Sequence, residues 1–322
     1  MDRLESMAAF VSVARAGGFS AASRELGIPL ATISRRVGEL ETALGVRLLR
    51  RSTRQVVVTE AGQRFFVACQ RALEDLRDAE EAVGSEYRTP RGDLLVTAPV
   101  AFGRLHLQPV ALDFLAAHPQ INLRMQLVDR IVNIADEHID AALRIAHLPD
   151  SGLTARALGS IRVLVCASPA YLRARGAPQR PEDLTQHDCI AWSILGPRDT
   201  WWFRDSGRER QYPIRTRLAT TLAESAIDAA TAGLGLVQTT SYQASQAIAD
   251  GRLLVLLRKF ECAVTPVSLV YARDRLLPLR LRAFLDFVAP RVAERLRSVA
   301  DTVEAAGRGR ALPQTQENPV PG

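Results

Sequence analysis

Lysine is almost absent from this chain: only Lys259 is lysine, and the other 40 of the 41 basic residues are arginine. A bias of this kind can follow from the base composition of a genome, so the arginine count alone is weak evidence for a nucleic-acid partner. Long apolar runs are also lacking. None approaches the roughly 18 residues of a membrane-spanning helix, which excludes a transmembrane protein and leaves no membrane partner to expect.

Metal-binding and catalytic patterns are missing as well. The four cysteines are far apart and include no Cys-x-x-Cys pair, and the five histidines show no ligand spacing, so neither a metal nor another cofactor is expected. The chain has no Gly-x-Ser-x-Gly run, no phosphate-binding loop and no paired Cys and His, so we predict no catalytic residues and no enzyme. We expect the four cysteines to be buried, reduced thiols, as is usual in a cytosolic protein. They are Cys69, Cys166, Cys189 and Cys262.

What is present is an ordinary globular composition. With 322 residues, 47% hydrophobic and 24% charged, the chain is long enough for two domains with real cores. The net charge of +6 permits an anionic partner without demanding one. The short apolar stretch from Met7 to Val11 follows Asp2 and Glu5 rather than a basic segment, so it does not resemble a signal peptide, and a cytoplasmic protein is expected.

The first 58 residues are predicted to form short helices separated by tight turns. Apolar residues recur at helical spacing from Leu4 to Ala14, and a glycine pair ends this first segment. Ser20 is the expected N-cap of a second helix over residues 21–26, which Gly27 closes.

A third helix is predicted after the turn at Pro29. Ile33, Val37 and Leu40 follow one another at intervals of four and three residues, so they share the inward face, and Gly45 ends the helix. Residues 48–58 then have apolar ends around a polar, arginine-bearing tip, which indicates two short strands.

Three helices and such a tip are typical of a winged helix-turn-helix, in which the third helix enters the major groove of DNA. Arginine bonds guanine bidentately, while serine and threonine hydroxyls adapt to bases or phosphates. On the outward face of the third helix the candidate base-contacting residues are Thr32, Ser34, Arg35 and Arg36. At the wing the candidate phosphate-contacting residues are Arg50, Arg51, Ser52, Thr53 and Arg54. The alternative is that these residues form only a solvated basic face on a small helical domain. This alternative could explain any one of the arginines, but it explains the whole set less well.

A long helix is predicted from Thr59 to about Tyr87, and residues 59–88 are assigned as a linker. Its apolar positions follow a heptad seam, which favours contact with the same helix of a second copy. The alternative is packing of this face on its own domain. The candidate dimerisation residues are Phe66, Leu73, Leu76 and Val83.

Strand and helix signals alternate from residue 89 to residue 306, which predicts open, mostly parallel sheets with helices on both faces, an α/β domain. A final helix is expected over residues 279–306, and the Gly- and Pro-containing residues 307–322 are expected to be a disordered tail.

In open α/β sheets, ligands bind beyond the carboxyl ends of the strands. On this ground the candidate effector-binding residues are Thr97, Pro99, Val100, Phe102, Asp129, Arg144, Ala146, Trp192, Ser193, Thr221 and Glu224. The first helix after Thr97 would offer free N–H groups to an anion. Arg144 either binds an effector carboxylate or forms an ion pair with Asp129 or Asp136. Trp201 and Trp202 are assigned to the core rather than to the site.

Matched positions over about sixty amino-terminal residues resemble the LysR-type transcriptional regulators. They are Gly18–Gly27, Thr32–Val37, Leu40–Glu41, Leu44–Leu48, Arg51–Arg54 and Thr59–Gly62. The likeness continues more loosely over Thr97–Arg104, Asp140–Ile145 and Leu164–Leu172. It implies a winged helix-turn-helix, a linker helix and a two-lobed effector domain similar to periplasmic binding proteins.

For function the resemblance implies a sequence-specific regulator that binds double-stranded DNA and a small-molecule effector held between the lobes. It also implies a homodimer or a tetramer, with RNA polymerase as a further candidate partner. Two rivals stay open at this stage: a solute-binding protein or enzyme built on the two-lobed part, and a thiol-based redox sensor of the same family.

Overall fold

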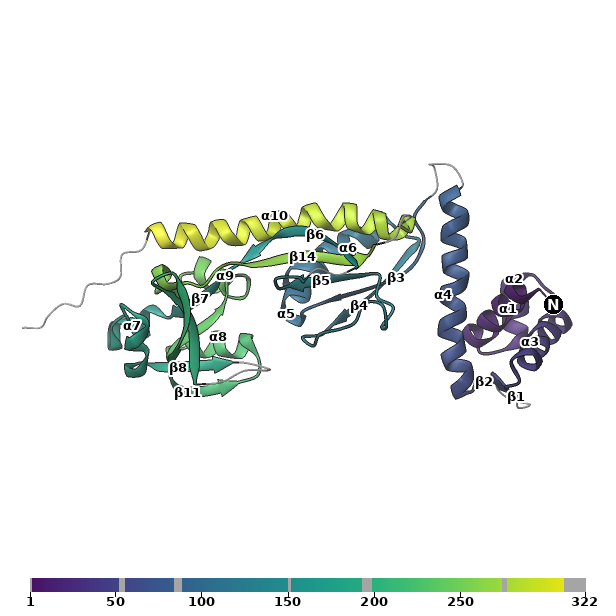
Figure 1. The fold of residues 1–322 in the computed structure, drawn as a ribbon, viewed down its shortest axis with the longest axis horizontal. Coiled ribbons are helices and arrows are strands. Elements are labelled where there is room, and N and C mark those ends of the chain that lie inside the picture. Colours follow the sequence, from purple (N-terminus) through teal and green to yellow (C-terminus); the bar gives the residue numbers. More distant parts are fainter. Residues whose placement is uncertain are drawn as a thin grey trace, which may run out of the picture. The chain divides into compact units, whose positions relative to one another are not determined.

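The structure is a computed structural model that describes residues 2–51, 56–83, 89–149, 152–192, 199–273 and 277–309. The chain divides into two compact units, residues 1–92 with 276–279, and residues 93–275 with 280–322 (Figure 1). Each unit is described by itself.

The first unit opens with three helices: α1 (Arg3–Ala16), α2 (Phe19–Leu26) and α3 (Leu30–Leu44). The carboxylate of Asp2 accepts hydrogen bonds from the backbone N–H groups of Leu4 and Glu5, which caps α1. Gly27 has a φ of 65°, a left-handed conformation that lets the chain turn sharply from α2 toward α3. The N-cap of α2 is Gly18, so the predicted cap at Ser20 is wrong: the helix begins two residues earlier than predicted, at Phe19.

The predicted inward faces of α1 and α3 pack together in the core of this unit. Phe10, Ile33, Val37 and Leu40 are each fully buried there. Strands β1 (Leu49–Arg51) and β2 (Val56–Val58) pair antiparallel after α3, which confirms the two strands of the wing. The tip between them, residues 52–55, lies outside the described residues.

Helix α4 (Glu60–Val83) belongs to the same unit. The Thr59 hydroxyl accepts a hydrogen bond of 2.9 Å from the backbone N–H of Gly62, so the residue predicted as the N-cap does cap this helix. The first half of α4 packs on α1: Cys69 is fully buried, and the ring of Phe66 lies 6.4 Å from that of Phe10.

The second unit consists of two lobes, each built on a five-stranded sheet. The sheet of lobe I has the order β4-β3-β5-β14-β6 and carries α5, a π-helical turn and α6. Its elements are β3 (Gly92–Ala98), α5 (Val100–Phe102), the π-turn (Gly103–Leu107), α6 (Gln108–Ala117), β4 (Ile121–Leu127), β5 (Ala141–Ile145), β6 (Leu153–Ile161) and β14 (Thr265–Ala272).

The sheet of lobe II has the order β11-β8-β12-β7-β13. A separate hairpin, β9 with β10, packs its Trp201 and Phe203 into the core of this lobe. The elements of the lobe are β7 (Val163–Ala167), α7 (Pro169–Arg175), β8 (Asp188–Trp192), β9 (Thr200–Asp205), β10 (Arg208–Pro213), β11 (Arg215–Thr220), α8 (Ala223–Thr231), β12 (Leu236–Thr240), α9 (Ser241–Ala249) and β13 (Leu254–Leu256). Two short 3₁₀ turns, Pro181–Gln186 and Arg258–Phe260, complete it.

Both sheets are mixed, so the prediction of mostly parallel sheets is wrong. Strand β3 is parallel to β5, and β8 is parallel to β11 and β12. In contrast, β14 is antiparallel to both β5 and β6, and β7 is antiparallel to β12 and β13. The reason lies in the connections between lobes: the chain passes from β6 into β7 and returns from β13 to β14, and strands that enter after such a crossing need not follow the βαβ direction. Apolar periodicity indicates that a strand exists but not which way it runs.

Helix α10 (Leu279–Gly309) runs along one side of both lobes (Figure 1). Its Phe284 ring lies 5.3 Å from that of Phe114 in lobe I, while Val303 is fully buried in the core of lobe II. The helix ends three residues beyond the predicted 306, and residues 310–322 of the predicted tail lie outside the described part of the chain. Among the described residues, no helix has the length and apolar content needed to cross a membrane.

Candidate DNA-binding and effector-binding sites

The outward face of α3 presents a short run of polar side chains. Arg35 is exposed and forms an ion pair of 2.6 Å with Glu39, one helical turn along the same face. Thr32 and Ser34 are partly exposed on the same amino-terminal part of the helix. These three predicted base-contacting residues therefore share an accessible stretch of α3.

Arg36 lies differently from the prediction. Its guanidinium turns back onto α1 and forms an ion pair with Glu5, which leaves 18% of the side chain exposed. The residue is one position beyond Arg35, about 100° around the helix, so it points toward the neighbouring helix rather than away from it. We therefore assign Arg36 to the positioning of α1 against α3 and not to base contact.

The wing is anchored by a residue that the sequence pattern did not single out. The carboxylate of Glu41, on α3, accepts hydrogen bonds from the backbone N–H groups of Leu48 (2.8 Å) and Leu49 (3.0 Å). Arg50 is exposed on β1, next to this anchor. Arg51, also predicted for the wing, lies in β1, but its side chain is not among those that the structure describes. The other predicted wing residues, Ser52, Thr53 and Arg54, lie outside the described residues.

At the end of β3 two predicted effector contacts are already engaged within lobe I. Thr97 is buried, and its hydroxyl donates a hydrogen bond of 2.8 Å to the carbonyl of Gln126. The N–H of Val100 at the start of α5 donates to Asp129 Oδ1 at 3.0 Å, so the carboxylate of Asp129 already occupies the anion position predicted at this helix start. Pro99 is half-buried between the two, and the Val100 side chain is exposed.

Phe102 is fully buried and links the two lobes instead of lining an open surface. Its ring lies 5.0 Å from that of His106 and 5.1 Å from that of Tyr242, which belongs to α9 of lobe II. Burial, with Arg295 of α10 adding to it, lowers the pKa of His106 to about 4. The aromatic cluster of Phe102, His106 and Tyr242 is therefore a neutral, dehydrated contact between the lobes at pH 7.

The ion pair with Asp129 or Asp136, one alternative for Arg144, is not its observed contact, and the other alternative, an effector carboxylate, stays a prediction. Its guanidinium donates a hydrogen bond of 2.7 Å to the carbonyl of Val132, and burial lowers its pKa while Glu137 acts against that effect. Ala146, two residues further, is exposed just beyond β5.

The lobe II residues gather around Gln238. The indole N–H of Trp192 donates to the backbone carbonyl of Gln238 at 2.7 Å, and the side-chain amide of Gln238 donates to the carbonyl of Trp202 at 3.0 Å. Trp201 is buried as predicted, but Trp202 is 51% exposed, so its assignment to the core is wrong: successive residues of β9 face opposite sides. Thr221 is exposed beyond β11, and Ser193 lies outside the described residues.

An ion pair between Arg104 and Glu224 joins lobe I to lobe II. Arg104 Nη2, on the π-turn of lobe I, lies 3.3 Å from Glu224 Oε1 at the start of α8 in lobe II. Both side chains keep substantial exposure, 54% and 41%. Glu224 was predicted and Arg104 was missed, although Arg104 follows Val100 by four residues and so shares its helical face.

The predicted dimerisation residues fall into two groups. Phe66 and Leu73 pack against the core of their own unit, which was the alternative for this helix face. Leu76 is 39% exposed, and the side chain of Val83 lies outside the description. Phe66 and Leu73 are each only partly buried in that core, so their contact with a partner helix stays a prediction.

The thiols are protonated and unpaired with one another. Burial raises the pKa of Cys166 and of Cys189 to about 12 and that of Cys69 to about 11, and it also raises the pKa of Cys262. All four are free cysteines. Within the described ranges, no group of three or more His, Cys, Asp or Glu side chains has the arrangement of a metal site.

A winged helix-turn-helix unit followed by two mixed α/β lobes defines a DNA-binding protein with a ligand-binding domain of the periplasmic-binding-protein kind. Comparison with known families matches the bacterial regulatory helix-turn-helix of the lysR family to residues 4–63 and the LysR substrate binding domain to residues 88–293. The chain belongs to the LysR family of transcriptional regulators. It is thus a DNA-binding regulator with an effector-binding domain, from a family of proteins that are not enzymes.

Individual relatives support the same assignment over nearly the whole chain. The chain is 36% identical to an HTH-type transcriptional regulator of Xanthomonas campestris pv. campestris, over 88% of this chain and 83% of that protein. It is 34% identical to CrgA, a LysR-type regulator from Neisseria meningitidis, whose solved structure covers 91% of this chain and 98% of its own with a TM-score of 0.57. The full-length virulence activator AphB of Vibrio cholerae is 28% identical, with a TM-score of 0.55 and coverage of 88% and 98%.

Proposed function

We propose that this regulator reads its operator through the amino-terminal part of α3, with Arg35 contacting a base and Thr32 and Ser34 contacting bases or phosphates. The observation that carries the proposal is the exposure of Arg35 and the partial exposure of Thr32 and Ser34 on the same part of one helix. The exposed Arg50 on β1 supplies a phosphate contact, as do Arg51 and Arg54 by their place in the sequence. Arg36 is left out because Glu5 holds it against α1.

Two copies bind two half-sites of a partly palindromic operator in the cytoplasm. Residues 1–58 form the DNA-binding domain, residues 59–88 the linker and residues 89–306 the effector domain. Dimer contact uses the later half of α4, where Leu76 is exposed and Val83 continues the seam. Assembly of dimers into tetramers is proposed from the family alone, and so is contact with RNA polymerase. We assign no residue of this chain to either.

The effector is a small anionic molecule bound between the lobes. The observation that carries this proposal is the ion pair between Arg104 and Glu224, because it places a charged donor of lobe I at the strand ends of both sheets. An effector carboxylate replaces the carboxylate of Glu224 on Arg104, and the exposed Trp202 and half-buried Trp192 supply apolar surface beside it. Because this exchange changes the contact between lobes, it gives the effector different affinities for two arrangements of the protein.

A single experiment tests reading of DNA and coupling to ligand. Duplexes bound by the full-length protein are selected from a random pool, with and without a panel of small carboxylates. We expect a partly palindromic consensus whose affinity changes with at least one compound. A pool that shows no enrichment over scrambled competitors at modest ionic strength contradicts the DNA-reading assignment, and a consensus that no carboxylate affects contradicts the anionic effector.

A further inference from the structure

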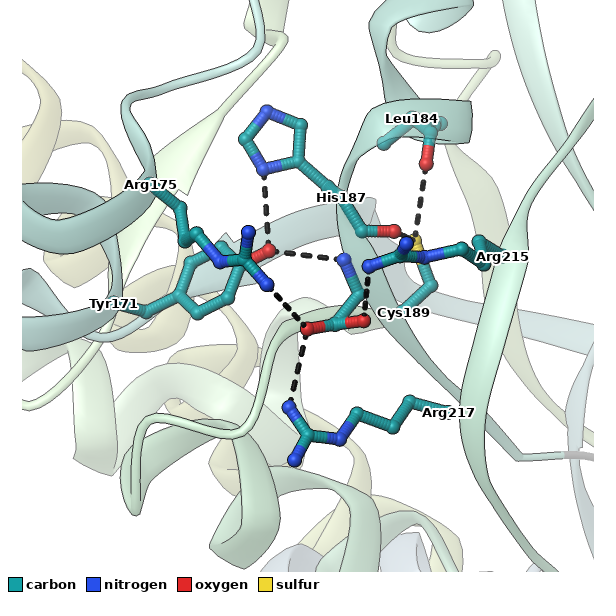
Figure 2. Close-up of polar contacts among 8 residues, drawn as sticks. Tyr171, Arg175, Leu184, His187, Cys189, Arg215 and Arg217 are labelled. Carbon is teal, nitrogen blue, oxygen red and sulfur yellow. Dashed lines mark hydrogen bonds and ion pairs between the residues drawn. The ribbon is translucent and has the colours of Figure 1, made fainter.

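Three arginines converge on one buried carboxylate in lobe II (Figure 2). The side chain of Asp188, at the start of β8, is only 8% exposed. Its Oδ1 accepts from Arg215 Nη2 at 2.5 Å, and its Oδ2 accepts from Arg217 Nη1 at 3.1 Å and from Arg175 Nη2 at 3.4 Å. The arginines come from two elements, the end of α7 and the edge strand β11.

The carboxylate at the centre of this cluster is held rigidly. The backbone N–H of Asp188 donates to the hydroxyl of Tyr171 at 3.0 Å, and the same hydroxyl lies 3.2 Å from Nδ1 of His187 (Figure 2). Burial of Asp188 acts to raise its pKa, but the hydrogen bonds from Arg215 and Arg217 outweigh it and keep the pKa below its usual range. Asp188 is therefore ionised at neutral pH and fixes the positions of the guanidinium groups around it.

The cluster holds more positive charge than Asp188 needs. One arginine would neutralise the carboxylate, whereas three leave a surplus of two charges. His187 adds none, because burial lowers its pKa and keeps the ring neutral at pH 7. Asp183 acts on His187 through its charge, and its carboxylate accepts hydrogen bonds from the backbone N–H groups of Gln179 and Arg180.

The arginines also present their unused donors to solvent. A guanidinium carries five N–H groups in a planar fork, and the contacts to Asp188 run through one terminal nitrogen of each side chain. More than half of each side chain is exposed: 54% for Arg175, 54% for Arg215 and 56% for Arg217. An approaching anion therefore meets three oriented donors at little cost in ordering them.

The cluster lies away from the effector-binding residues. Asp188 pairs with Arg215 at the amino ends of the parallel strands β8 and β11, whereas Trp192 pairs with Thr220 at their carboxyl ends. Four residues of extended strand separate the two ends by about 13 Å. Occupation of one site therefore leaves the other open.

We propose that Arg175, Arg215 and Arg217, organised by Asp188, bind a phosphate dianion, either inorganic phosphate or the phosphate group of a monoester. The surplus of two positive charges matches a phosphate group, which carries about −1.5 to −2 at pH 7, while a single carboxylate would leave one charge uncompensated. Guanidinium groups also suit the tetrahedral oxygens through paired N–H donors. Bound phosphate ties the end of α7 to the edge strand β11 and stabilises lobe II.

Isothermal titration of the full-length protein tests this site. Inorganic phosphate and glycerol phosphate are each titrated at constant ionic strength, with chloride as the reference. We expect a phosphate-specific binding event, and we expect Arg217→Gln and Arg175→Gln each to weaken it at least about tenfold, the loss typical of one charge-assisted donor. Comparable binding of both ligands shows that the site accepts a phosphate monoester, and binding of inorganic phosphate alone restricts it to the free ion.

Arg173→Gln is the matched control, because Arg173 is exposed on the same helix and takes no part in the cluster. It should bind phosphate as the unmodified protein does. The proposal is overturned if phosphate gives no more heat than chloride, or if both cluster variants keep the original affinity while circular dichroism shows them folded. DNA binding measured on the same samples separates this result from the proposed function, which does not depend on it.

Discussion

Arg104 of lobe I and Glu224 of lobe II form an ion pair of 3.3 Å between side chains that are 120 positions apart in the sequence. The pair meets where the carboxyl ends of strands in both sheets come together, close to the buried ring contact between Phe102 and Tyr242. The polar contact is exposed and exchangeable, whereas the aromatic contact is buried. A ligand can therefore replace the first without disrupting the second.

The first prediction concerns the energy of this pair. Arg104→Gln and Glu224→Gln should each change the free energy of unfolding by less than about 1 kcal/mol, and the double variant should show a coupling of about 0.2–1 kcal/mol, because exposed ion pairs are weak. Urea unfolding at low salt measures the coupling, and added salt should reduce it. Glu137→Gln, which removes an ion pair with Arg130 inside lobe I, should show no coupling to Arg104. Zero coupling at low salt would show that the two lobes do not meet at these residues in solution.

The second prediction separates base reading from phosphate contact. Arg35→Ala should weaken binding to the selected operator by about 1–3 kcal/mol and relax the preference at one base position. Arg50→Ala should weaken specific and random DNA alike and reduce the salt dependence by about one charge. Competition binding over a salt series distinguishes the two outcomes. An equal loss on specific and random DNA for Arg35→Ala would remove its assigned role.

The third prediction concerns pH. The pKa of His106 is lowered to about 4 from its usual 6.5, so between these values the unfolded chain binds a proton that the folded protein does not. The free energy of unfolding should therefore fall as the pH drops from 6.5 to 4, by up to about 3 kcal/mol from this residue.

His106→Phe keeps a ring between Phe102 and Tyr242 and should lose this part of the pH dependence. Denaturant unfolding at pH 7 and at pH 4.5 measures the difference. His147→Gln, at an exposed position of the same lobe, is the control and should keep the full dependence. If the free energy of unfolding of His106→Phe depends on pH as that of the unmodified protein does, the His106 imidazole of the unmodified protein is protonated in the folded state over this pH range.

The fourth prediction addresses the redox-sensor alternative. Because burial raises the pKa values of Cys166 and Cys189 to about 12, these thiols stay protonated and unreactive at neutral pH. Titration with a thiol reagent should be slow on the native protein and should reach all four cysteines only after unfolding. Mild peroxide should leave operator binding unchanged, and a fast loss of binding would restore the redox-sensor reading.

The DNA-binding unit could be predicted from the sequence almost element by element. Helices α2 and α3 are short, amphipathic and closed by Gly27 and Gly45, so local signals determine them. What could not be predicted is the pairing of individual charges: Arg35 and Arg36 are adjacent in sequence, yet one faces outward and the other contacts Glu5 on a different helix.

The effector-binding residues were harder to predict because non-local contacts decide their roles. Thr97 and Val100 do lie at a strand end, as expected, but Gln126 and Asp129 already satisfy their hydroxyl and N–H groups. The direction of β14 likewise depends on where the chain crosses back from lobe II, which no local pattern records. Arg104 was within reach of sequence reasoning through its spacing from Val100, whereas its partner became visible only in three dimensions.

Helix α10 limits how far the two lobes can move. Leu296 packs near Gly159 of lobe I, Val303 is buried in lobe II, and the sequence from Arg291 to Ala306 contains neither glycine nor proline. Wide opening, as in proteins whose lobes are joined only by flexible strands, would require bending the helix between these two contacts or pulling one end out of its core. We therefore expect a bound ligand to change the angle between the lobes by a small twist rather than by wide opening.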